Sequence, residues 1–312
     1  MNVSQPARSL FNRLRYKHLL MLVTLGNSLN LHRAAETLNM SQPATSRMLQ
    51  EIEDAFGCSL FERQARGMRP TVLGEELLRF ARAALNGLER CAEELADRQA
   101  GGYGYLAVGA IMGAVPDLVV QSIAEIKSNH PLLRLRIMGD TSDQLSELLD
   151  QRRIDVAVAR LTNSDDRNRF AFEPLGDEHL VVVVRAGHPL NNASRPSLIE
   201  MVEAWPWILQ PDTSPARVAL EQAFSRLEVP SPCDVIECSS VFAMLQLVQI
   251  TDGILVLTDT VVRDYVQTGL LRILDVEVEE KLSPFGLILR KDEQPSRELA
   301  MFLKILRKWA VK

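Results

Sequence analysis

Residues 30–47 are predicted to form two short helices joined by a tight turn, and this segment restricts the possible folds more than any other. Asn30 and Ser41 belong to residue types that cap helix N-termini, and Pro43 falls in the first turn of the second helix, where its missing N–H is not needed. The alanine pair at 34–35 lets another helix cross closely. The pattern indicates a helix-turn-helix, although an ordinary helical hairpin with a polar second helix also fits this segment.

The second helix begins with polar side chains. In a helix-turn-helix, this end of the second helix enters the major groove of DNA, where its side chains contact base edges. The helix ends at Gly57, a residue suited to a left-handed C-cap, and a loop with three arginines follows, whose charges suit phosphate contacts. We therefore expect DNA contacts from Gln42, Pro43, Thr45, Ser46, Arg47, Arg63, Arg66 and Arg69.

A longer set of residues agrees with this interpretation in order and spacing: Ala34-Ala35-Glu36, Leu38, Ser41-Gln42-Pro43-Ala44, Ser46-Arg47, Leu60-Phe61, Arg63, Thr71 and Gly74. The set resembles the winged helix-turn-helix of LysR-type transcriptional regulators. One residue departs from the family pattern, because Thr45 stands where an aliphatic residue is usual. The family has about this chain length, so the resemblance implies a bacterial LysR-type regulator over nearly the whole chain.

Charge is divided unevenly along the chain. The first 70 residues carry nine Lys and Arg against five Asp and Glu, a net charge of +4; the whole chain carries −5, so the remainder carries −9. A basic head on an acidic body suits a module in which only the head meets phosphate, although many enzymes show a similar asymmetry.

Composition also bears on the cellular compartment. No apolar run reaches the roughly 18 residues of a membrane span, and the N-terminal segment lacks the pattern of a secretory signal. The cysteines are scattered, which fits a reducing cytoplasm better than a disulfide framework: Cys58, Cys91, Cys233 and Cys238. We expect a cytoplasmic protein without membrane contact.

From residue 71 onward the sequence predicts one long helix. Its apolar seam has spacings of 4, 3, 4, 3 and 4 residues and consists of Leu77, Ala81, Ala84, Leu88, Cys91 and Leu95. We expect Cys91 to be a small buried residue of this seam, and charged residues off the seam, such as Arg90, to stay solvated. The seam favours pairing with a second chain, while packing within one chain remains the alternative. The resemblance likewise implies that this helix pairs two subunits. The glycine-rich segment 101–104 then predicts a hinge.

Residues 105–312 alternate strand and helix, which predicts an α/β body with mostly parallel sheets. The resemblance implies the two-lobed fold of periplasmic binding proteins. We therefore expect a winged helix-turn-helix at 1–71, a linker (dimerisation) helix at 72–100 and an effector-binding domain at 101–312. Its lobe I comprises 105–176 and 281–312, and its lobe II comprises 177–280.

Ligands of open α/β sheets bind beyond the carboxyl ends of strands, beside helix N-termini. This rule selects Met112, Thr141, Ser142, Arg160, Thr213, Ser214, Ser239 and Ser240 as candidate effector contacts. Helix capping alone would also explain the serines and threonines. Arg160 could instead pair with Asp155 or another acid, and Met112 could pack or gate. Hydroxyls with one arginine suit a sugar, a sugar acid or an aromatic acid, and the sequence does not choose among them.

Other functions are less well supported. The chain has no HExxH, Walker, dinucleotide or GxSxG motif, and its histidines form no recognisable acid–base pair, so we expect no enzyme, no cofactor and no metal site. Peroxide-sensing members of the resembling family use a cysteine pair in lobe II, which makes Cys233 and Cys238 a redox alternative. The expected partners are an operator in double-stranded DNA, a small-molecule effector and further copies of the chain in a dimer or tetramer.

Overall fold

The computed structural model describes residues 14–65, 67–99, 101–102, 104–163, 166–192, 195–276, 282–291 and 293–310. The chain divides into two compact units. Unit 1 comprises Met1–Tyr105 with Glu147–Asp155, and unit 2 comprises Leu106–Ser146 with Val156–Lys312. Within the described residues, no helix is long and apolar enough to cross a membrane.

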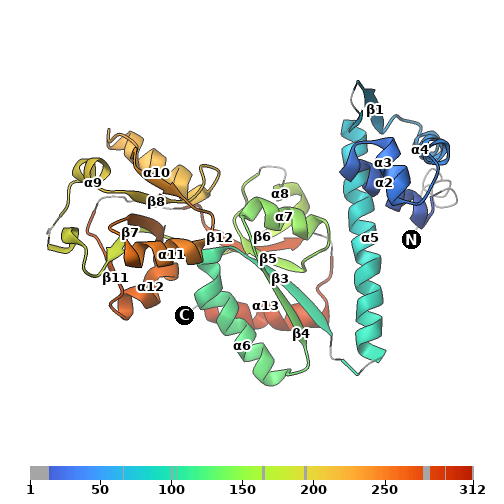
Figure 1. Cartoon of the computed structure of the whole chain (residues 1–312). Coiled ribbons are helices and arrows are strands. Elements are labelled where there is room, and N and C mark those ends of the chain that lie inside the picture. The colour runs from blue at the N-terminus through green and yellow to red at the C-terminus, as the bar shows by residue number, and fades with distance from the viewer. Residues whose placement is uncertain are drawn as a thin grey trace. The chain divides into compact units, whose positions relative to one another are not determined.

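Unit 1 carries a small helical head and one long helix (Figure 1). Its elements are α2 (Tyr16–Ser28), α3 (Leu31–Thr37), α4 (Gln42–Phe56), β1 (Phe61–Gln64), β2 (Gly67–Pro70) and α5 (Val72–Gln99). The head core joins all of these except β2 through buried apolar side chains, among them Met21, Leu22, Leu25, Ala34, Met48, Leu49, Ile52, Leu60, Phe61, Leu78 and Ala81.

The predicted helix ends are confirmed. The Asn30 side chain accepts hydrogen bonds from two N–H groups at the start of α3, at 2.9 and 3.2 Å. The Ser41 hydroxyl accepts the N–H of Ala44 at 3.4 Å, and Pro43 lies in the first turn of α4. Gly57 ends α4 with a left-handed φ of 70°. Asn30 thus caps the start of α3, and Ser41, between α3 and α4, caps the start of the second helix.

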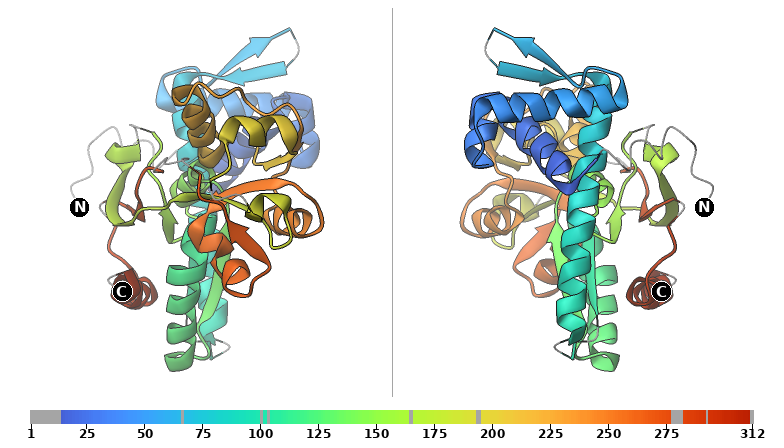
Figure 2. Two further views of the ribbon diagram at one scale, coloured as in Figure 1. Left: turned by 90° about the vertical axis from the view of Figure 1, so that its left-hand side faces the viewer. Right: turned by 90° about the vertical axis from the view of Figure 1, so that its right-hand side faces the viewer.

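The β1–β2 hairpin forms the wing, which projects beyond the helices of the head in Figure 2. The Glu53 carboxylate fixes its base by accepting the N–H groups of Leu60 and Phe61 at 2.7 and 3.2 Å. At the other end of the hairpin, the N–H of Met68 donates to the Leu29 carbonyl at 2.8 Å. A Cβ at Gly67, whose φ is 114°, would lie 2.6 Å from that same carbonyl oxygen, so the close approach requires glycine.

The long helix α5 is confirmed, but its faces differ from the predicted seam. Ala81 is buried in the head core, whereas Cys91 is exposed, so the expectation of a buried Cys91 is wrong for the single chain. An exposed apolar stripe on α5 consists of Leu73, Phe80, Leu88 and Leu95. The predicted seam did not include Leu73 or the aromatic residue Phe80.

Arg90 is also not the solvated residue that its position off the seam predicted. Its guanidinium pairs with Asp155 at 2.7 Å and lies 5.9 Å from the centre of the Tyr105 ring. Asn86, one turn earlier, donates to the Gln151 carbonyl at 2.8 Å. The turn after α7 thus docks on α5 within unit 1, and the alternative of an Arg160–Asp155 pair is wrong because Asp155 belongs to this contact.

Unit 2 consists of two lobes. Lobe I has a five-stranded sheet in the order β4-β3-β5-β12-β6. Its strands are β3 (Tyr105–Ala110), β4 (Arg134–Gly139), β5 (Val156–Ala159), β6 (Phe170–Gly176) and β12 (Phe285–Arg290). Its helical segments are η1 (Met112–Ala114), η2 (Val115–Val119), α6 (Val120–Asn129), α7 (Ser142–Asp150), α8 (Asp166–Arg169) and α13 (Arg297–Ala310).

Lobe II has a second five-stranded sheet, in the order β11-β7-β10-β8-β9. Its strands are β7 (Leu180–Arg185), β8 (Trp207–Leu209), β9 (Val235–Glu237), β10 (Ile254–Thr258) and β11 (Leu271–Ile273). Its helical segments are η3 (Pro189–Asn192), α9 (Leu198–Ala204), α10 (Pro215–Arg226), α11 (Val241–Ile250) and α12 (Asp259–Gln267). Apolar clusters fill both faces of this sheet.

The return of the chain to lobe I through β12 and α13 is confirmed, since β12 pairs with both β5 and β6. The expectation of mostly parallel sheets is wrong. β12 runs antiparallel to both neighbours, and β7 runs antiparallel to both β10 and β11. The crossing between lobes is the reason, because a strand that returns from the other lobe enters its sheet without a right-handed βαβ crossover.

Candidate functional site

A hollow of about 360 Å³ lies in the head between the start of α4 and the wing. Of the predicted DNA contacts, it brings together Gln42, Pro43, Ser46 and Arg63. Arg47 is exposed on the same helix and Arg69 is exposed on β2, but neither lines the hollow. Arg66 lies outside the described residues. The first turn of α4 and both strands of the wing therefore line one concave surface.

Thr45 is the exception among the described candidates. Its side chain is fully buried, and its hydroxyl donates to the Ser41 carbonyl at 3.2 Å within the helix. A side chain without exposed surface makes no base contact, so its selection as a DNA contact is wrong. The physical reason is helix geometry, since Thr45 lies on the face of α4 that packs on the head core and Ser46 does not.

The hollow also includes residues that were not among the predicted DNA contacts: Asn30, Leu31, His32, Gln64, Gly67 and Met68. They come from the start of α3 and from the wing. The hydrogen bond between Met68 and Leu29 brings these two segments together. The spacing of residues in the sequence does not predict this contact. The basic character of the wing loop was the only available signal.

A larger cleft of about 730 Å³ lies in unit 2 between lobes I and II. Predicted residues from both lobes line it: Met112, Thr141, Ser142, Arg160, Thr213, Ser214 and Ser239. Each follows the carboxyl end of a strand, as the rule for open α/β sheets requires. The eighth candidate, Ser240, is not among the lining residues, because its hydroxyl accepts the N–H of Ala243 and caps α11. The helix cap accounts for this hydroxyl, and its assignment as an effector contact stays a prediction.

Arg160 forms a buried ion pair in this cleft. Its guanidinium contacts the carboxylate of Glu178, and the two residues are 6% and 2% exposed. Arg160 Nε also donates to the Ser283 carbonyl at 2.8 Å, and its backbone N–H donates to the Ser142 hydroxyl at 3.1 Å. Burial lowers the pKa of Arg160 to about 10, so the side chain is still charged at neutral pH. The cleft thus contains a positive charge that is already paired.

Glu178 is the main cleft residue that sequence reasoning missed. It lies two residues before β7. One of its carboxylate oxygens, Oε1, is buried and has no hydrogen-bond partner among the described residues. A Cβ at Gly113 would lie 1.3 Å from this oxygen, so the carboxylate occupies the space that a side chain at Gly113 would need. Thr258 lines the cleft beside the same glycine.

Two hydroxyl–amide pairs face the cleft, one in each lobe. In lobe I, the Thr141 hydroxyl donates to Gln144 Oε1 at 2.8 Å. In lobe II, the Ser214 hydroxyl donates to Gln210 Oε1. Each pair presents a hydroxyl and an amide next to one another, a combination of donors and acceptors that suits a hydroxylated ligand.

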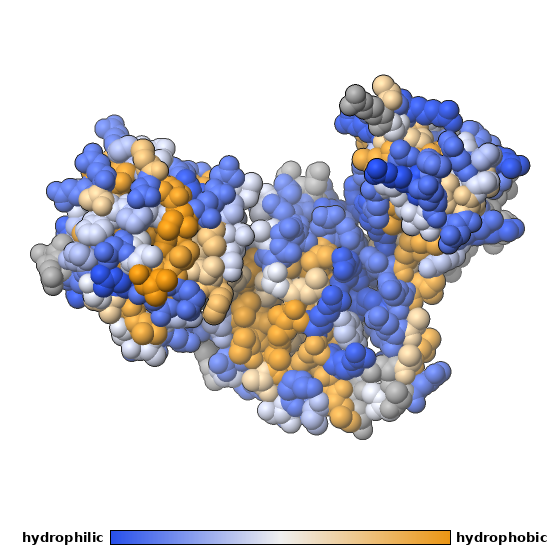
Figure 3. Space-filling view, in the orientation of Figure 1, coloured by the Kyte–Doolittle hydropathy of each residue, from blue (hydrophilic) through white to orange (hydrophobic). Residues whose placement is uncertain are grey.

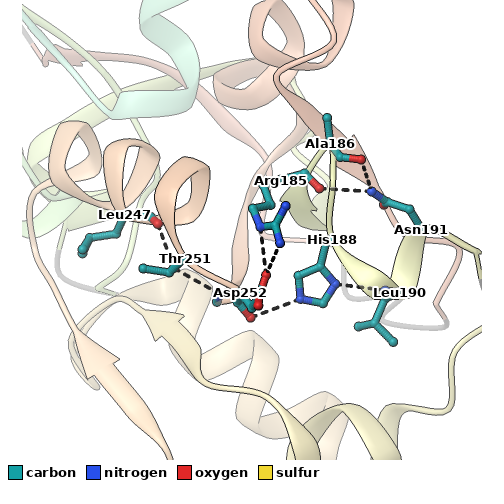
Figure 4. Close-up of polar contacts among 9 residues, drawn as sticks. Arg185, Ala186, His188, Leu190, Asn191, Leu247, Thr251 and Asp252 are labelled. Carbon is teal, nitrogen blue, oxygen red and sulfur yellow. Dashed lines mark hydrogen bonds and ion pairs between the residues drawn. The ribbon is translucent and has the colours of Figure 1, made fainter.

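A buried histidine, His188, lies outside the cleft. His188 is buried, with Nδ1 accepting the N–H of Leu190 at 3.1 Å and Nε2 lying 3.1 Å from the Asp252 carbonyl (Figure 4). The Asp252 carboxylate in turn pairs with Arg185 at 2.6 Å, and the Trp205 ring lies 4.5 Å from the imidazole. The cluster holds the β7–η3 turn against the end of α11.

The two cysteines of the redox alternative are both free. Cys233 is exposed, and Cys238 is half-buried with its thiol 3.4 Å from the Ser240 carbonyl. Neither lines the cleft. Among the described residues, no group of three or more His, Cys, Asp or Glu side chains could hold a metal ion.

The chain is similar in sequence to known proteins over both units. Residues 99–311 match the LysR substrate binding domain, and residues 16–75 match the bacterial regulatory helix-turn-helix protein of the lysR family. The HTH-type transcriptional regulator GbpR of Azospirillum brasilense is 36% identical over 296 residues, covering 95% of this chain and 86% of that protein. The regulator PcaQ of Agrobacterium fabrum is 30% identical over 299 residues, covering 96% of each chain.

Solved structures share the fold. Full-length CbnR complexed with its target DNA superposes with a TM-score of 0.60 at 20% identity, covering 95% of this chain and 100% of that chain. A full-length OxyR from Pseudomonas aeruginosa gives a TM-score of 0.56 at 22% identity, covering 95% and 94%. The sequence relatives named above are transcriptional regulators and not enzymes, which agrees with the lack of catalytic motifs. The chain therefore belongs to the LysR family of transcriptional regulators.

Proposed function

We propose that this regulator binds an operator through the head and responds to a small molecule bound between the lobes of unit 2. The observation that carries the proposal is the common cleft, because seven of eight residues chosen by a rule for ligand sites line it. The domain division predicted at 71/72 and 100/101 is part of this proposal.

On the DNA side, we assign base contacts to Gln42, Pro43, Ser46 and Arg47, all in the first turns of α4. Arg63, Arg66 and Arg69 of the wing loop are assigned to phosphates. The concave surface between α4 and the wing supports this division, since it presents the helix start and one wing arginine to the same side.

One recognition helix covers little DNA, so two heads on a two-fold pair of half-sites are proposed. The exposed stripe of α5 supports pairing of two chains through this helix. A tetramer would need a second contact. The face of lobe II that carries α11 offers apolar surface for one (Figure 3), including Phe242 and Ile250, which are 71% and 78% exposed.

For regulation, we propose that the effector changes the relative position of the two lobes and thereby biases the angle between the paired heads and the bend of the DNA. Such coupling between sites is typically about 1–3 kcal/mol, or roughly 5- to 150-fold. It can change promoter output while operator binding persists, provided that the ligand distinguishes two states of the protein.

The test replaces Ser214 or Ser239 with Leu in the full chain and measures operator affinity and bend angle. The probe is the first compound of a metabolite panel that raises the Tm of the wild-type protein. Each variant should lose the response to the probe and keep its basal operator affinity, while the control Ser225→Leu, on the exposed side of α10, keeps both. A full response in the Ser214 and Ser239 variants would place the ligand elsewhere.

A further inference from the structure

We propose that the ligand of the cleft is an uncharged, polyhydroxylated small molecule of the sugar or polyol class and not a carboxylate. This inference rests on the proposed function of the cleft as the effector site. It follows from the ion pair between Arg160 and Glu178 in the cleft.

Among the described residues that line the cleft, Arg160 alone carries a positive charge, and it contacts Glu178. Both side chains are almost fully buried. An acid could gain Arg160 only by displacing Glu178, which would leave a carboxylate buried without a partner. That outcome is strongly unfavourable. The arginine that suggested an acidic ligand in the sequence is therefore not available to one.

The second argument concerns the charge of the Glu178 carboxylate in the cleft wall. Its Oε1 and the Nη2 of Arg160 are both buried without a hydrogen-bond partner among the described residues, so neither atom has surface to offer a ligand. A ligand carboxylate would be repelled by the like charge of Glu178, whereas a ligand hydroxyl carries no charge.

Helix N-termini favour anions, and three of them, at α7, α10 and α11, lie near the cleft. In this cleft, the attraction of each helix N-terminus for an anion is reduced. Asp140 and Asp143 lie at the start of α7, and Pro215 begins α10 without an N–H. The Ser240 hydroxyl accepts an N–H at the start of α11. The two carboxylates disfavour an anion at the α7 end, and the α10 and α11 ends each have one N–H fewer to offer it.

The remaining polar groups match hydroxyls. The pairs Thr141–Gln144 and Ser214–Gln210 approach from opposite lobes, and each presents a hydroxyl beside an amide. Apolar side chains complete the wall, including Ile111, Met112, Val115, Leu257 and Val261. A sugar or polyol offers hydroxyls to the first set and C–H surface to the second, which is the usual division of labour in ligand clefts.

The experiment measures the Tm and binding heat of the full-length protein with matched sets of compounds. The sets are aldoses and alditols of five and six carbons, the aldonic and uronic acids of the same skeletons, the corresponding amino sugars, and benzoate with its hydroxylated derivatives. At least one neutral member should raise the Tm and bind at least tenfold more tightly than its acid counterpart, a ratio that one unfavourable charge contact accounts for. The proposal would be overturned if an acid bound more tightly than its neutral counterpart. It would also be overturned if only an amino sugar bound, or if no neutral compound bound.

The variant Glu178→Gln separates the charge argument from shape. It leaves Arg160 without its counter-charge, so aldonic acids should begin to bind and the preference for the neutral ligand should fall at least about tenfold. The control Glu173→Gln removes a carboxylate from the exposed pair with Arg307 in lobe I and should change neither preference. If Glu178→Gln fails to fold, the comparison of neutral and acidic compounds on the wild type still decides the outcome.

Failure of this inference can be told apart from failure of the proposed function. Binding of an acid that Ser214→Leu abolishes would overturn the ligand class and keep the cleft as the effector site. Binding of any compound that both Ser214→Leu and Ser239→Leu leave unchanged would mean that the ligand occupies another site, and the proposed function would then fail.

Discussion

Arg263 of α12 and Asp117 of η2 form a two-point contact that joins lobe II to lobe I beside the cleft. Arg263 Nη1 lies 2.7 and 2.6 Å from the two carboxylate oxygens of Asp117. The hydrogen bond to the carboxylate raises the pKa of Arg263 above its ordinary value. Asp117 itself lies in a π-helical turn, a geometry that often occurs at functional positions. Movement of one lobe against the other must alter this contact.

Breaking that contact should weaken binding in the cleft. Arg263→Gln is expected to lower affinity for the ligand by at most about fivefold, because both partners are more than a third exposed and such pairs contribute about 0.2–1 kcal/mol. The exchanged pair Asp117→Arg with Arg263→Asp should restore affinity. Arg307→Gln, which breaks a two-point pair inside lobe I, is the control and should have no effect on calorimetric affinity. Equal losses in both variants would mean that the contact between lobes has no special role.

Adjacent residues of α4 should differ sharply in DNA binding. Ser46→Val removes a hydroxyl from the hollow and is expected to weaken operator binding by about 0.5–1.5 kcal/mol, the value of one hydrogen bond, while affecting random DNA little. Thr45→Val changes a hydroxyl that bonds only within the helix, so operator affinity should stay within about threefold of the wild type. Fluorescence anisotropy on both DNAs measures the difference. The reverse order would reassign the face of α4 that meets DNA.

The exposed stripe of α5 should determine self-association. Phe80→Glu or Leu88→Glu places a charge where a second chain is expected to pack, so sedimentation should show monomers and operator affinity should fall. Glu89→Gln, on an adjacent exposed position of the helix, is the matched control. A Leu88→Glu protein that remains dimeric and footprints normally would contradict pairing through α5.

His188 should make stability depend on pH. Burial outweighs the hydrogen bond to Asp252 and lowers the pKa of His188 below its ordinary 6.5. The unfolded chain therefore binds more protons near pH 6, so the contribution of this residue is fully present above about pH 6.5 and is lost as the pH falls through the folded pKa. His188→Gln should lower the Tm at pH 7.5 but show a smaller further loss at pH 5.5. Thermal melts of the wild type and of His188→Gln at both pH values measure the difference.

Local rules predicted the helix ends of the head and the position of the cleft. The caps at Asn30, Ser41 and Gly57 depend on neighbours within a few residues, so single positions sufficed. The cleft residues follow strand ends, and that rule needs only the order of strands. Ser240 shows where this reasoning stops, since capping and ligand contact require the same residue type.

Contacts between distant segments were not predictable in this way. The partner of Arg160 is Glu178, which belongs to the crossover into lobe II. No sequence pattern predicts that Glu178 also lies against Gly113. The faces of α5 were misjudged for a related reason. The head covers Ala81 and the turn before β5 covers Arg90, so the exposed stripe is what remains after packing and is not a regular seam.

The bond from Met68 to the Leu29 carbonyl makes the wing a rigid part of the head. Because Gly67 leaves no room for adjustment at that contact, the span from the start of α4 to the wing is fixed before DNA arrives. A bound DNA duplex must therefore match its groove and its phosphate backbone to the fixed distance between the start of α4 and the wing. If the head binds DNA as proposed, we expect sequences that adopt this groove width easily to bind more tightly, even where the protein contacts no base pair.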